Sequence, residues 1–401
     1  MTRLVPSSLS ELRDAVAGAL TAEEPLEIIG GGSKLALGRP LQTPHLLDLS
    51  PLAGIRDYAP SELVLTAGAA TPLAEIEQAL AANNQMLAFE PPRWQDLLGS
   101  DSHPTLGGVL ACNLSGPRRI KAGAARDHFL GFCGVSGRGE IFKAGGKVVK
   151  NVTGYDLPKL MAGSYGTLAA LEEVTVKVLP RPEAAATVLI AGLDPEAAVR
   201  LMAAALGSPH EVSAAAYLPP ATALPVGAGS VALRVEGPPP SVVFRRDSLL
   251  REHDGSHRSE TFDDVESAAF WREIGEAAPL SGFGERAVWR ISVPPMRGAA
   301  IGMALARQLD AVWFLDWGGG LLWAAVPAAA DGGGAAIRAT IRNAEGQGGG
   351  HATLVKAPPA VRRAVAVFEP APAPLNALSR RIKEAFDPHH ILNPGRMVEG
   401  Q

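Results

Sequence analysis

Three glycine-rich turns stand in the first half of this 401-residue chain. Residues 26–34 read Leu-Glu-Ile-Ile-Gly-Gly-Gly-Ser-Lys, residues 103–109 read His-Pro-Thr-Leu-Gly-Gly-Val, and residues 163–168 read Gly-Ser-Tyr-Gly-Thr-Leu. Because glycine has no Cβ, such turns let the backbone approach a ligand closely and aim its N–H groups at it. Together the turns predict a large, extended, anionic ligand held mainly by main chain, and a dinucleotide fits that description. Taken singly, each turn can also be read as a tight strand connection.

Two familiar nucleotide-binding signatures are excluded. The first turn does not extend to G-x-G-x-x-G, because Leu35 stands where the third glycine belongs and no acidic residue ends a second Rossmann strand. Residues 145–148 read Gly-Gly-Lys-Val, so the lysine is not followed by the Ser or Thr of a P-loop. A nucleotide site built on these turns is therefore of another type.

The composition is that of a soluble globular protein. Apolar residues make up 47% of the chain, charged residues 19%, and the net charge is −4. The length favours two or three domains, and the lack of a basic field argues against a nucleic-acid partner. The two cysteines, Cys112 and Cys133, match neither a disulfide framework nor a metal-binding pattern. We therefore predict that the protein holds no metal and that both thiols are small buried side chains.

The N-terminus does not resemble a targeting segment. Glu11, Arg13 and Asp14 interrupt any apolar stretch there, and no uncharged apolar run approaches the roughly 20 residues of a membrane span. This pattern predicts a cytoplasmic protein without a membrane span.

Short strands alternate with helices in the first half of the chain, which predicts an α+β arrangement. Ser8 and Glu11 are spaced as a capping box ahead of a helix that carries Leu12 and Val16 on its apolar face. Thr71 is expected to cap a second helix, with Pro72 at its first position. Strands are predicted at residues 26–29, 44–49, 63–67, 129–135, 140–142 and 171–179.

The composition shifts after residues 180–182, which read Pro-Arg-Pro. From 184 to about 367 the chain is rich in alanine and glycine and predicts a separate domain, a sheet with helices on one face. The predicted helices are 195–206, 265–276, 296–309 and 335–344, and the predicted strands include 287–293, 353–356 and two around Asp316-Trp317. A long charged connection is expected before residue 265. A Pro-rich linker at 369–374 leads into a final helix at 375–386.

Three sequence blocks accompany the turns. Residues 105–119 read Thr-Leu-Gly-Gly-Val-Leu-Ala-Cys-Asn-Leu-Ser-Gly-Pro-Arg-Arg, residues 150–156 read Lys-Asn-Val-Thr-Gly-Tyr-Asp, and residues 393–396 read Asn-Pro-Gly-Arg. In this order, the turns and blocks resemble flavoproteins of the vanillyl-alcohol-oxidase (PCMH) type, and among them the FAD-binding E subunits of bacterial glycolate oxidase. The resemblance is strong over residues 25–180, weak through the middle of the chain, and firm again over 375–397.

The resemblance implies an α+β fold with a two-part PCMH-type FAD-binding domain at residues 1–183. An α+β cap domain would occupy 184–368, and a C-terminal segment at 369–401 would return to the FAD domain. The implied function is the FAD-binding subunit of a complex that oxidises glycolate, a 2-hydroxy acid, to glyoxylate. Electrons would pass through the flavin to an iron–sulfur subunit, and a larger related flavoprotein subunit is the other implied partner. The implied location is cytoplasmic, or peripheral to the inner membrane through the partner subunits.

The resemblance also implies which residues hold the cofactor. Backbone N–H groups of the first turn would wrap the pyrophosphate, the second turn would line the diphosphate and ribityl region, the third would approach the adenine, and the tail would reach the flavin. The residues are Ile29, Gly30, Gly31, Gly32, Ser33, Lys34, Thr105, Gly107, Gly108, Asn113, Gly116, Gly166, Thr167, Val174, Asn393 and Arg396. Several relatives attach the flavin through a histidine in the first turn. Lys34 follows Ser33 here, so FAD is expected to be non-covalent.

Oxidation of a 2-hydroxy acid requires a base for the hydroxyl proton and a cation for the carboxylate. His389 and His390 are the candidate bases, because an imidazole titrates near neutral pH. Alternatively, one of them caps the final helix and the other is exposed. Arg118 and Arg119 are the candidates for the carboxylate, and they can instead form salt bridges to the cap domain or to a partner subunit.

Two other functions fit the same residues. One is a self-sufficient FAD-dependent oxidoreductase acting on another 2-hydroxy acid or on a sugar lactone. The other is a catalytically silent scaffold subunit whose FAD site only holds a complex together.

Overall fold

The computed structural model describes residues 2–146, 154–222, 224, 229–253, 257–343 and 349–400. Lys147 and residues 150–153 of the Lys-Asn-Val-Thr-Gly-Tyr-Asp block lie outside the described residues. The chain divides into two compact units. Unit 1 contains residues 1–114, 123–181 and 370–401, and unit 2 contains residues 115–122 and 182–369.

The expected domain borders differ from this division at one place. Residues 115–122 were expected in the FAD domain, but they pack within unit 2. The indole Nε1 of Trp317 donates to the carbonyl oxygen of Gly116 at 3.0 Å, and Arg118 forms an ion pair with Glu236 at 2.8 Å. These two polar contacts hold the segment to the elements of unit 2.

Unit 1 is built from two main groups of strands. Within the described residues, a parallel sheet has the order β1 (Thr2–Leu4), β3 (His45–Asp48), β2 (Leu26–Ile29). An antiparallel sheet has the order β4 (Ile55–Ala59), β5 (Val64–Gly68), β9 (Ala169–Lys177), β7 (Phe129–Ser136), β8 (Ile141–Gly145). A short pair joins β6 (Gln85–Met86) and β10 (Leu179–Pro180).

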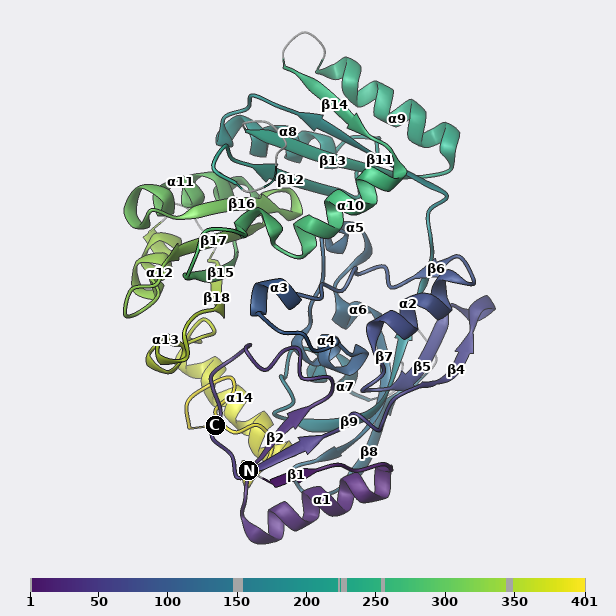
Figure 1. Ribbon diagram of the computed structural model, residues 1–401, viewed down its shortest axis with the longest axis vertical. Coiled ribbons are helices and arrows are strands. Elements are labelled where there is room, and N and C mark those ends of the chain that lie inside the picture. Colours follow the sequence, from purple (N-terminus) through teal and green to yellow (C-terminus); the bar gives the residue numbers. More distant parts are fainter. Residues whose placement is uncertain are drawn as a thin grey trace. The chain divides into compact units, whose positions relative to one another are not determined.

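Helices lie between these strands, and a C-terminal helix follows them (Figure 1). They are α1 (Leu9–Ala22), α2 (Leu73–Ala81), α3 (Gln95–Leu98), α4 (Leu106–Cys112), α6 (Ala125–His128), α7 (Leu157–Met161), the C-terminal α14 (Ala373–Phe386) and the 3-10 turn η1 (Pro60–Glu62).

Two of the capping interactions predicted for the helix N-termini need correction. Ser8 caps α1 by accepting from the backbone N–H of Glu11, but the Glu11 carboxylate accepts from the N–H of Ser7, so the capping box closes one residue early. Thr71 does not cap α2. Its hydroxyl donates to the carbonyl of Gly68 at 2.6 Å, because the tight turn after β5 brings that oxygen closer than the helix N–H groups.

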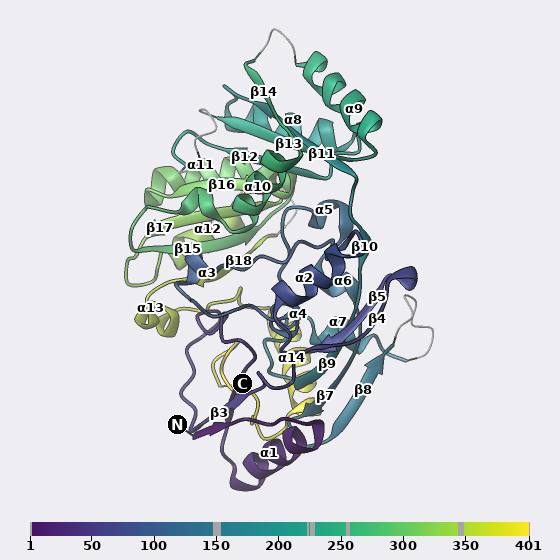
Figure 2. The same cartoon turned by 45° about the vertical axis from the view of Figure 1, so that its right-hand side comes forward.

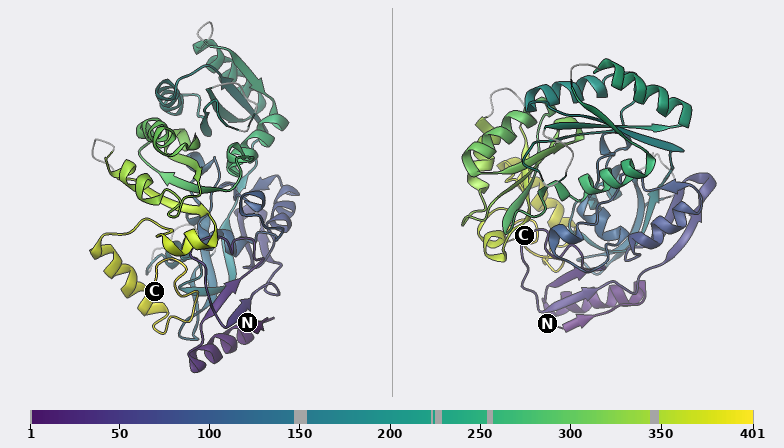
Figure 3. Two further views of the ribbon diagram at one scale, coloured as in Figure 1. Left: turned by 60° about the vertical axis from the view of Figure 1, so that its left-hand side comes forward. Right: turned by 45° about the horizontal axis from the view of Figure 1, so that its top comes forward.

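The C-terminal segment returns to unit 1. Figure 3 shows it, in yellow, reaching the purple N-terminal strands. Ile391 and Leu392 are buried in one apolar cluster with Leu12 of α1, Leu26 of β2 and Leu47 of β3. Burying one such side chain contributes about 1.5–3 kcal/mol, so the end of the chain is part of the core.

Unit 2 is a sheet covered by helices. Within the described residues the strand order is β14 (Ser259–Phe262), β11 (Ala184–Ile190), β13 (Ser230–Gly237), β12 (Ala214–Leu218), β16 (Val312–Asp316), β17 (Leu321–Pro327), β15 (Arg286–Ser292), β18 (His351–Lys356), with antiparallel neighbours throughout. Its helices are α5 (Arg119–Ala122), α8 (Pro195–Leu206), α9 (Pro239–Glu252), α10 (Asp264–Gly275), α11 (Gly298–Leu309), α12 (Gly334–Asn343) and α13 (Pro359–Ala364). The 3-10 turns are η2 (Ala278–Leu280), η3 (Pro295–Arg297) and η4 (Trp317–Gly319).

Two expectations for unit 2 need correction. The charged connection before residue 265 contains the helix α9, which the sequence pattern had not indicated. Helices also lie on both faces of the sheet (Figure 2). Helices α8, α9, α11 and α12 contribute to the large apolar cluster with alternate strand residues such as Val188. On the other face, Trp271 of α10 donates to the hydroxyl of Thr187 at 2.8 Å, because adjacent strand residues point to opposite sides.

Candidate functional site

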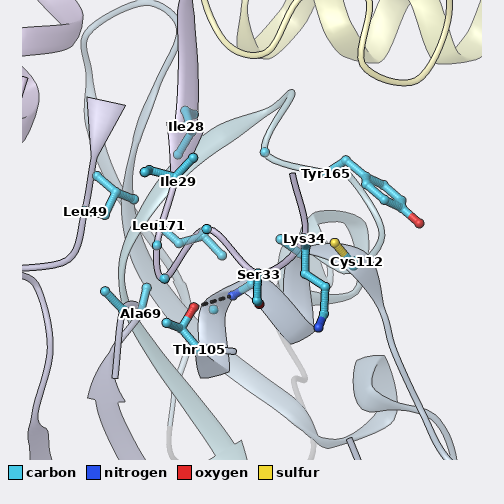
Figure 4. Close-up of a pocket in the computed structure, with 18 of the residues that line it drawn as sticks. Ile28, Ile29, Ser33, Lys34, Leu49, Ala69, Thr105, Cys112, Tyr165 and Leu171 are labelled. Atoms are coloured by element: carbon cyan, nitrogen blue, oxygen red, sulfur yellow. Dashed lines mark hydrogen bonds between the residues drawn. The ribbon is translucent and has the colours of Figure 1, made fainter. Parts of the chain in front are cut away.

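A pocket in unit 1 is lined by all three glycine turns and by the C-terminal segment (Figure 4). Twelve of the residues predicted to hold the cofactor line it: Ile29, Gly30, Gly31, Gly32, Ser33, Lys34, Thr105, Gly107, Gly108, Gly166, Asn393 and Arg396. Segments separated by hundreds of residues in the sequence therefore converge on one cavity.

The first and second turns touch through their glycines. A Cβ on Gly31 would overlap the carbonyl oxygen of His103, and a Cβ on Gly30 would stand 2.7 Å from the hydroxyl of Thr105. Gly31 therefore allows the close approach of two backbone segments, whereas Gly30 leaves room for the Thr105 side chain. The Thr105 hydroxyl also accepts from the N–H of Gly108 at 3.3 Å, which fixes the start of α4.

The first turn presents backbone donors to the pocket. Within the described part of the chain, no hydrogen-bond partner is found for the N–H groups of Gly30, Gly31 and Gly32. All three glycines are partly buried and line the pocket. Phosphate oxygens are suitable acceptors for such a group of donors, so the turn fits the pyrophosphate of a dinucleotide.

Asn393 joins the first and third turns. Its Oδ1 accepts from the N–H of Ile28 at 2.8 Å, and its Nδ2 donates to the carbonyl of Tyr165 at 2.7 Å. The side chain is buried, and the backbone φ of 44° is left-handed, which asparagine tolerates better than most residues. A Cβ on Gly166 would stand 2.7 Å from the Asn393 amide nitrogen, so the third turn needs glycine there.

The two cations of the lining have protein acceptors. Arg396 is buried, pairs with the Glu27 carboxylate and donates to the carbonyls of Leu35 and Leu37, both at 3.2 Å. The Lys34 ammonium donates to the carbonyl of Arg93. Arg396 thus braces the chain that follows the first turn, and both residues place positive charge beside the pocket.

Cys112, at the end of α4, also lines the pocket. Burial raises the pKa of its thiol to about 12, although the nearby charges of Lys34 and Arg396 act in the opposite direction. The thiol is therefore protonated at neutral pH, as expected for a small apolar side chain rather than a nucleophile.

Four residues predicted to hold the cofactor lie outside the pocket lining. Asn113 ends α4, and its side chain accepts from the N–H of Arg126 at 3.1 Å. Gly116 belongs to unit 2, where its carbonyl accepts from Trp317. The Thr167 hydroxyl donates to Ser164 within the third turn at 2.7 Å. Val174 is fully buried in the middle of β9, with strand neighbours on both sides.

The predicted catalytic residues are distributed over both units. His389 and His390 follow α14 in unit 1, and neither is among the described residues that line the pocket. Arg118 pairs with Glu236 in unit 2, which matches the alternative of a salt bridge within the cap. The Arg119 guanidinium lies 4.3 Å from the centre of the Trp317 ring.

Arg119 is part of a cluster that sequence reasoning missed. Arg290 of β15 lies 4.9 Å from the same Trp317 ring. Desolvation lowers the pKa of His351 below its ordinary value, and the charges of Arg290 and Arg119 lower it further, whereas Glu369 opposes the shift. The charges of both guanidinium groups on the Trp317 ring therefore act on the His351 imidazole.

Sequence reasoning also missed the apolar part of the pocket. Most of these lining residues lie next to the turns in the sequence, and that position is the signal that could have found them, whereas Leu49, Ala69 and Ala70 follow other strands. The lining residues in question are Ile28, Leu35, Leu37, Leu49, Ala69, Ala70, Ala111, Cys112, Tyr165, Ala169 and Leu171. Such surfaces suit the flat rings of a nucleotide cofactor.

Two further observations concern the described residues alone. No group of three or more His, Cys, Asp or Glu side chains is arranged to hold a metal ion. No described helix combines the length and the apolar character needed to cross a membrane.

Comparison with known proteins identifies the fold. Residues 3–145 match the FAD binding domain family. The 4-ethylphenol oxidase of Gulosibacter chungangensis shares the fold, with a TM-score of 0.73 at 16% identity over 100% of this chain and 89% of that one. The chain therefore has a PCMH-type FAD-binding fold, and the glycine turns that line the pocket are compatible with that cofactor.

Two curated relatives are similar in sequence. Glycolate oxidase subunit GlcD of Bacillus subtilis is 44% identical over 85 residues, which cover 21% of this chain and 18% of that one. Glycolate oxidase subunit GlcE of Escherichia coli is 35% identical over 386 residues, which cover 96% of each chain. Because the second similarity spans both units, this FAD-dependent oxidoreductase belongs to the family of the glycolate oxidase subunit GlcE.

Proposed function

We propose that this chain is the flavin-binding subunit of an enzyme complex that oxidises glycolate to glyoxylate and passes the electrons to an iron–sulfur subunit. The observation that carries the proposal is the similarity to GlcE over 96% of both chains, together with a pocket whose glycine turns fit FAD. A larger related flavoprotein subunit of the GlcD type would be the other partner. FAD would be bound without a covalent link, since Lys34 follows Ser33 in the first turn.

Bound FAD supplies the acceptor for the hydride that leaves C2 of the 2-hydroxy acid. The chain itself must supply the rest. The backbone donors of the first turn bind the pyrophosphate, and the positive charges of Lys34 and Arg396 favour an electron-rich reduced ring. The alcohol proton requires a base, and the carboxylate of the substrate requires a cation.

Arg119 is our candidate for the carboxylate. A guanidinium group stacked on an aromatic ring is oriented and partly desolvated, which strengthens its bonds to a carboxylate. Arg290 on the same Trp317 ring adds a second cation. Arg118, already paired with Glu236, is the less suitable of the two predicted arginines.

His389 and His390 remain our candidates for the base, as the sequence indicates. Substituting His389 by Asn and, separately, His390 by Asn distinguishes the two through the rate of flavin reduction in a single turnover.

The decisive experiment is anaerobic titration of the FAD-loaded protein with glycolate, followed at 450 nm, with glyoxylate measured as product. The chain alone and the complex purified through a tag on this chain are compared. Bleaching in the complex with one glyoxylate per two electrons supports the proposal. A complex of tagged chain, GlcD-type flavoprotein and iron–sulfur subunit that holds FAD but is not reduced by glycolate would overturn it.

A further inference from the structure

We propose that Lys383 is a positioning residue for the FAD site, because it locks the C-terminal segment between the first and third glycine turns. The proposal concerns cofactor binding and does not depend on which substrate is oxidised. Its argument lies wholly within unit 1 and begins from one buried ammonium group.

Lys383 is the one buried residue of α14, within the part of the chain that the structure describes. Its Nζ donates three hydrogen bonds: to the carbonyl of Thr167 at 2.8 Å, to the carboxylate of Asp387 at 2.6 Å, and to the carbonyl of Leu392 at 3.0 Å. A lysine ammonium has three donors, so each hydrogen has an acceptor. The three acceptors lie on the third glycine turn, on the end of the helix and on the returning tail.

Asp387 connects the end of α14 to the C-terminal tail. Its two carboxylate oxygens accept from the N–H groups of Ile391 and Leu392 at 2.9 and 2.8 Å. These residues run beside β2, where the N–H of Leu26 donates to Ile391 at 2.7 Å and the N–H of Asn393 donates to Leu26 at 3.0 Å. The position of Asn393 is therefore fixed by the bonds that start at Lys383.

Asn393 completes the connection by bonding Ile28 and Tyr165, which both line the pocket. Lys383 thus holds the third turn directly through Thr167, and it holds the first turn indirectly through the tail. FAD must contact both turns at once, so a change in their separation weakens its binding even in a folded chain.

Stability alone does not account for a buried ion pair of this kind. Lys383 and Asp387 are almost fully excluded from solvent, and the desolvation of two charges often cancels their attraction. Burial lowers the pKa of the Lys383 ammonium, and the Asp387 carboxylate partly restores it. What the pair adds is geometry, since three directed bonds fix three backbone segments relative to one another.

The test compares FAD affinity with the stability of the FAD-free protein. Removing Lys383 alone would leave a buried carboxylate, so the variant is the double substitution Lys383→Met with Asp387→Asn. The matched control is Leu80→Ala, which opens a cavity at a fully buried position of α2. Melting temperature is measured without FAD, FAD affinity by quenching of flavin fluorescence, and the bound ring by visible circular dichroism.

We expect the double variant to bind FAD at least tenfold more weakly and to alter the visible circular dichroism, under conditions where the FAD-free protein is fully folded. Leu80→Ala should lower the melting temperature while FAD affinity stays within twofold. If the double variant loses stability as the control does but keeps FAD affinity and the spectrum within twofold of wild type, the proposal is wrong.

A measurement on the wild-type chain covers the case of a variant that does not fold. Amide hydrogen exchange with and without FAD should show slower exchange at Ile391, Leu392 and Asn393 when FAD is bound, and little change in α2. Equal protection of the tail and α2, or none in the tail, would overturn the proposal.

Discussion

The backbone N–H of Gly107 donates to the carbonyl oxygen of Ala69 at 2.8 Å, and a Cβ on Gly107 would stand 2.6 Å from that same oxygen. The neighbouring Gly108 is different. Its Cβ would meet only the Thr105 hydroxyl, at 3.1 Å, and Gly108 lines the pocket as well. The fold therefore requires the first of these adjacent glycines, and we expect the second to matter for the ligand of the pocket.

We expect Gly107→Ala to destabilise the FAD-free protein by about 1–3 kcal/mol, as overpacking against a backbone oxygen does. Gly108→Ala should leave the melting temperature of the FAD-free protein nearly unchanged, since alanine favours α4, and should weaken FAD binding about tenfold or more. Thermal melts and flavin fluorescence titrations measure the two effects. Wild-type FAD affinity in Gly108→Ala would remove this glycine from the cofactor site.

Asn393→Asp tests the link between the first and third turns. The carboxylate can still accept from the N–H of Ile28, but it cannot donate to the carbonyl of Tyr165 and repels it. Loss of such a buried bond costs about 1–3 kcal/mol, so we expect FAD affinity to fall about tenfold or more.

Asn376→Asp is the matched control for this change. Asn376 donates to the carbonyl of Ala371 at 2.9 Å at the start of α14 and does not line the pocket, so the same chemical change should leave FAD affinity unaltered. Equal effects of the two substitutions on FAD affinity would mean that Asn393 has no particular role in the site.

The sequence predicts the cofactor cradle because the reason for each glycine is local. A run such as Gly30-Gly31-Gly32 after an apolar strand indicates a close backbone approach even when the other segment is unknown. The contact of Gly31 with His103 confirms that interpretation, although the partner could not be named beforehand.

Other features depend on contacts that no local pattern records. Lys383 lies among charged residues on α14, so its sequence context predicts a solvent-exposed side chain. Instead it is buried and bonds Thr167, which is 216 residues away in the sequence. The sequence pattern did not indicate α9 because this helix exposes an apolar side chain and buries a charged one. Phe244 is exposed, and Arg245 is buried, where it donates to the carbonyls of His210 and Glu236 at 3.0 and 2.7 Å.

The pKa of Cys112 predicts an unreactive thiol. With a pKa of about 12, only about one thiol in ten thousand is ionised at pH 8, against about a quarter for an ordinary cysteine. In a Cys133→Ser background, the rate of iodoacetamide labelling of the FAD-free protein should rise tenfold per pH unit up to pH 10. Labelling should slow further with FAD, because Cys112 lines the pocket. A plateau near pH 8–9 would show that the thiol has an ordinary pKa.

Substitutions in the ion pair between Arg118 and Glu236 can distinguish a structural role of Arg118 from a role in binding the substrate. Both side chains are about nine-tenths buried, and Arg234 also lies 3.6 Å from the Glu236 carboxylate, so Arg118→Met removes the nearer of two cations and should cost about 1–3 kcal/mol of stability. Adding Glu236→Gln removes the carboxylate charge but also takes an ion-pair partner from Arg234, so a double-mutant cycle of unfolding free energies measures how strongly Arg118 and Glu236 are coupled.

The variant with both substitutions is then tested for catalysis at a temperature where it is fully folded. If Arg118 only holds residues 115–122 within unit 2, Arg118→Met with Glu236→Gln keeps the wild-type KM for glycolate in the assembled complex. Arg119→Met, which removes the guanidinium stacked on Trp317, should instead raise KM about tenfold or more. A raised KM in the double variant would instead support the prediction from the sequence that Arg118 binds the substrate carboxylate.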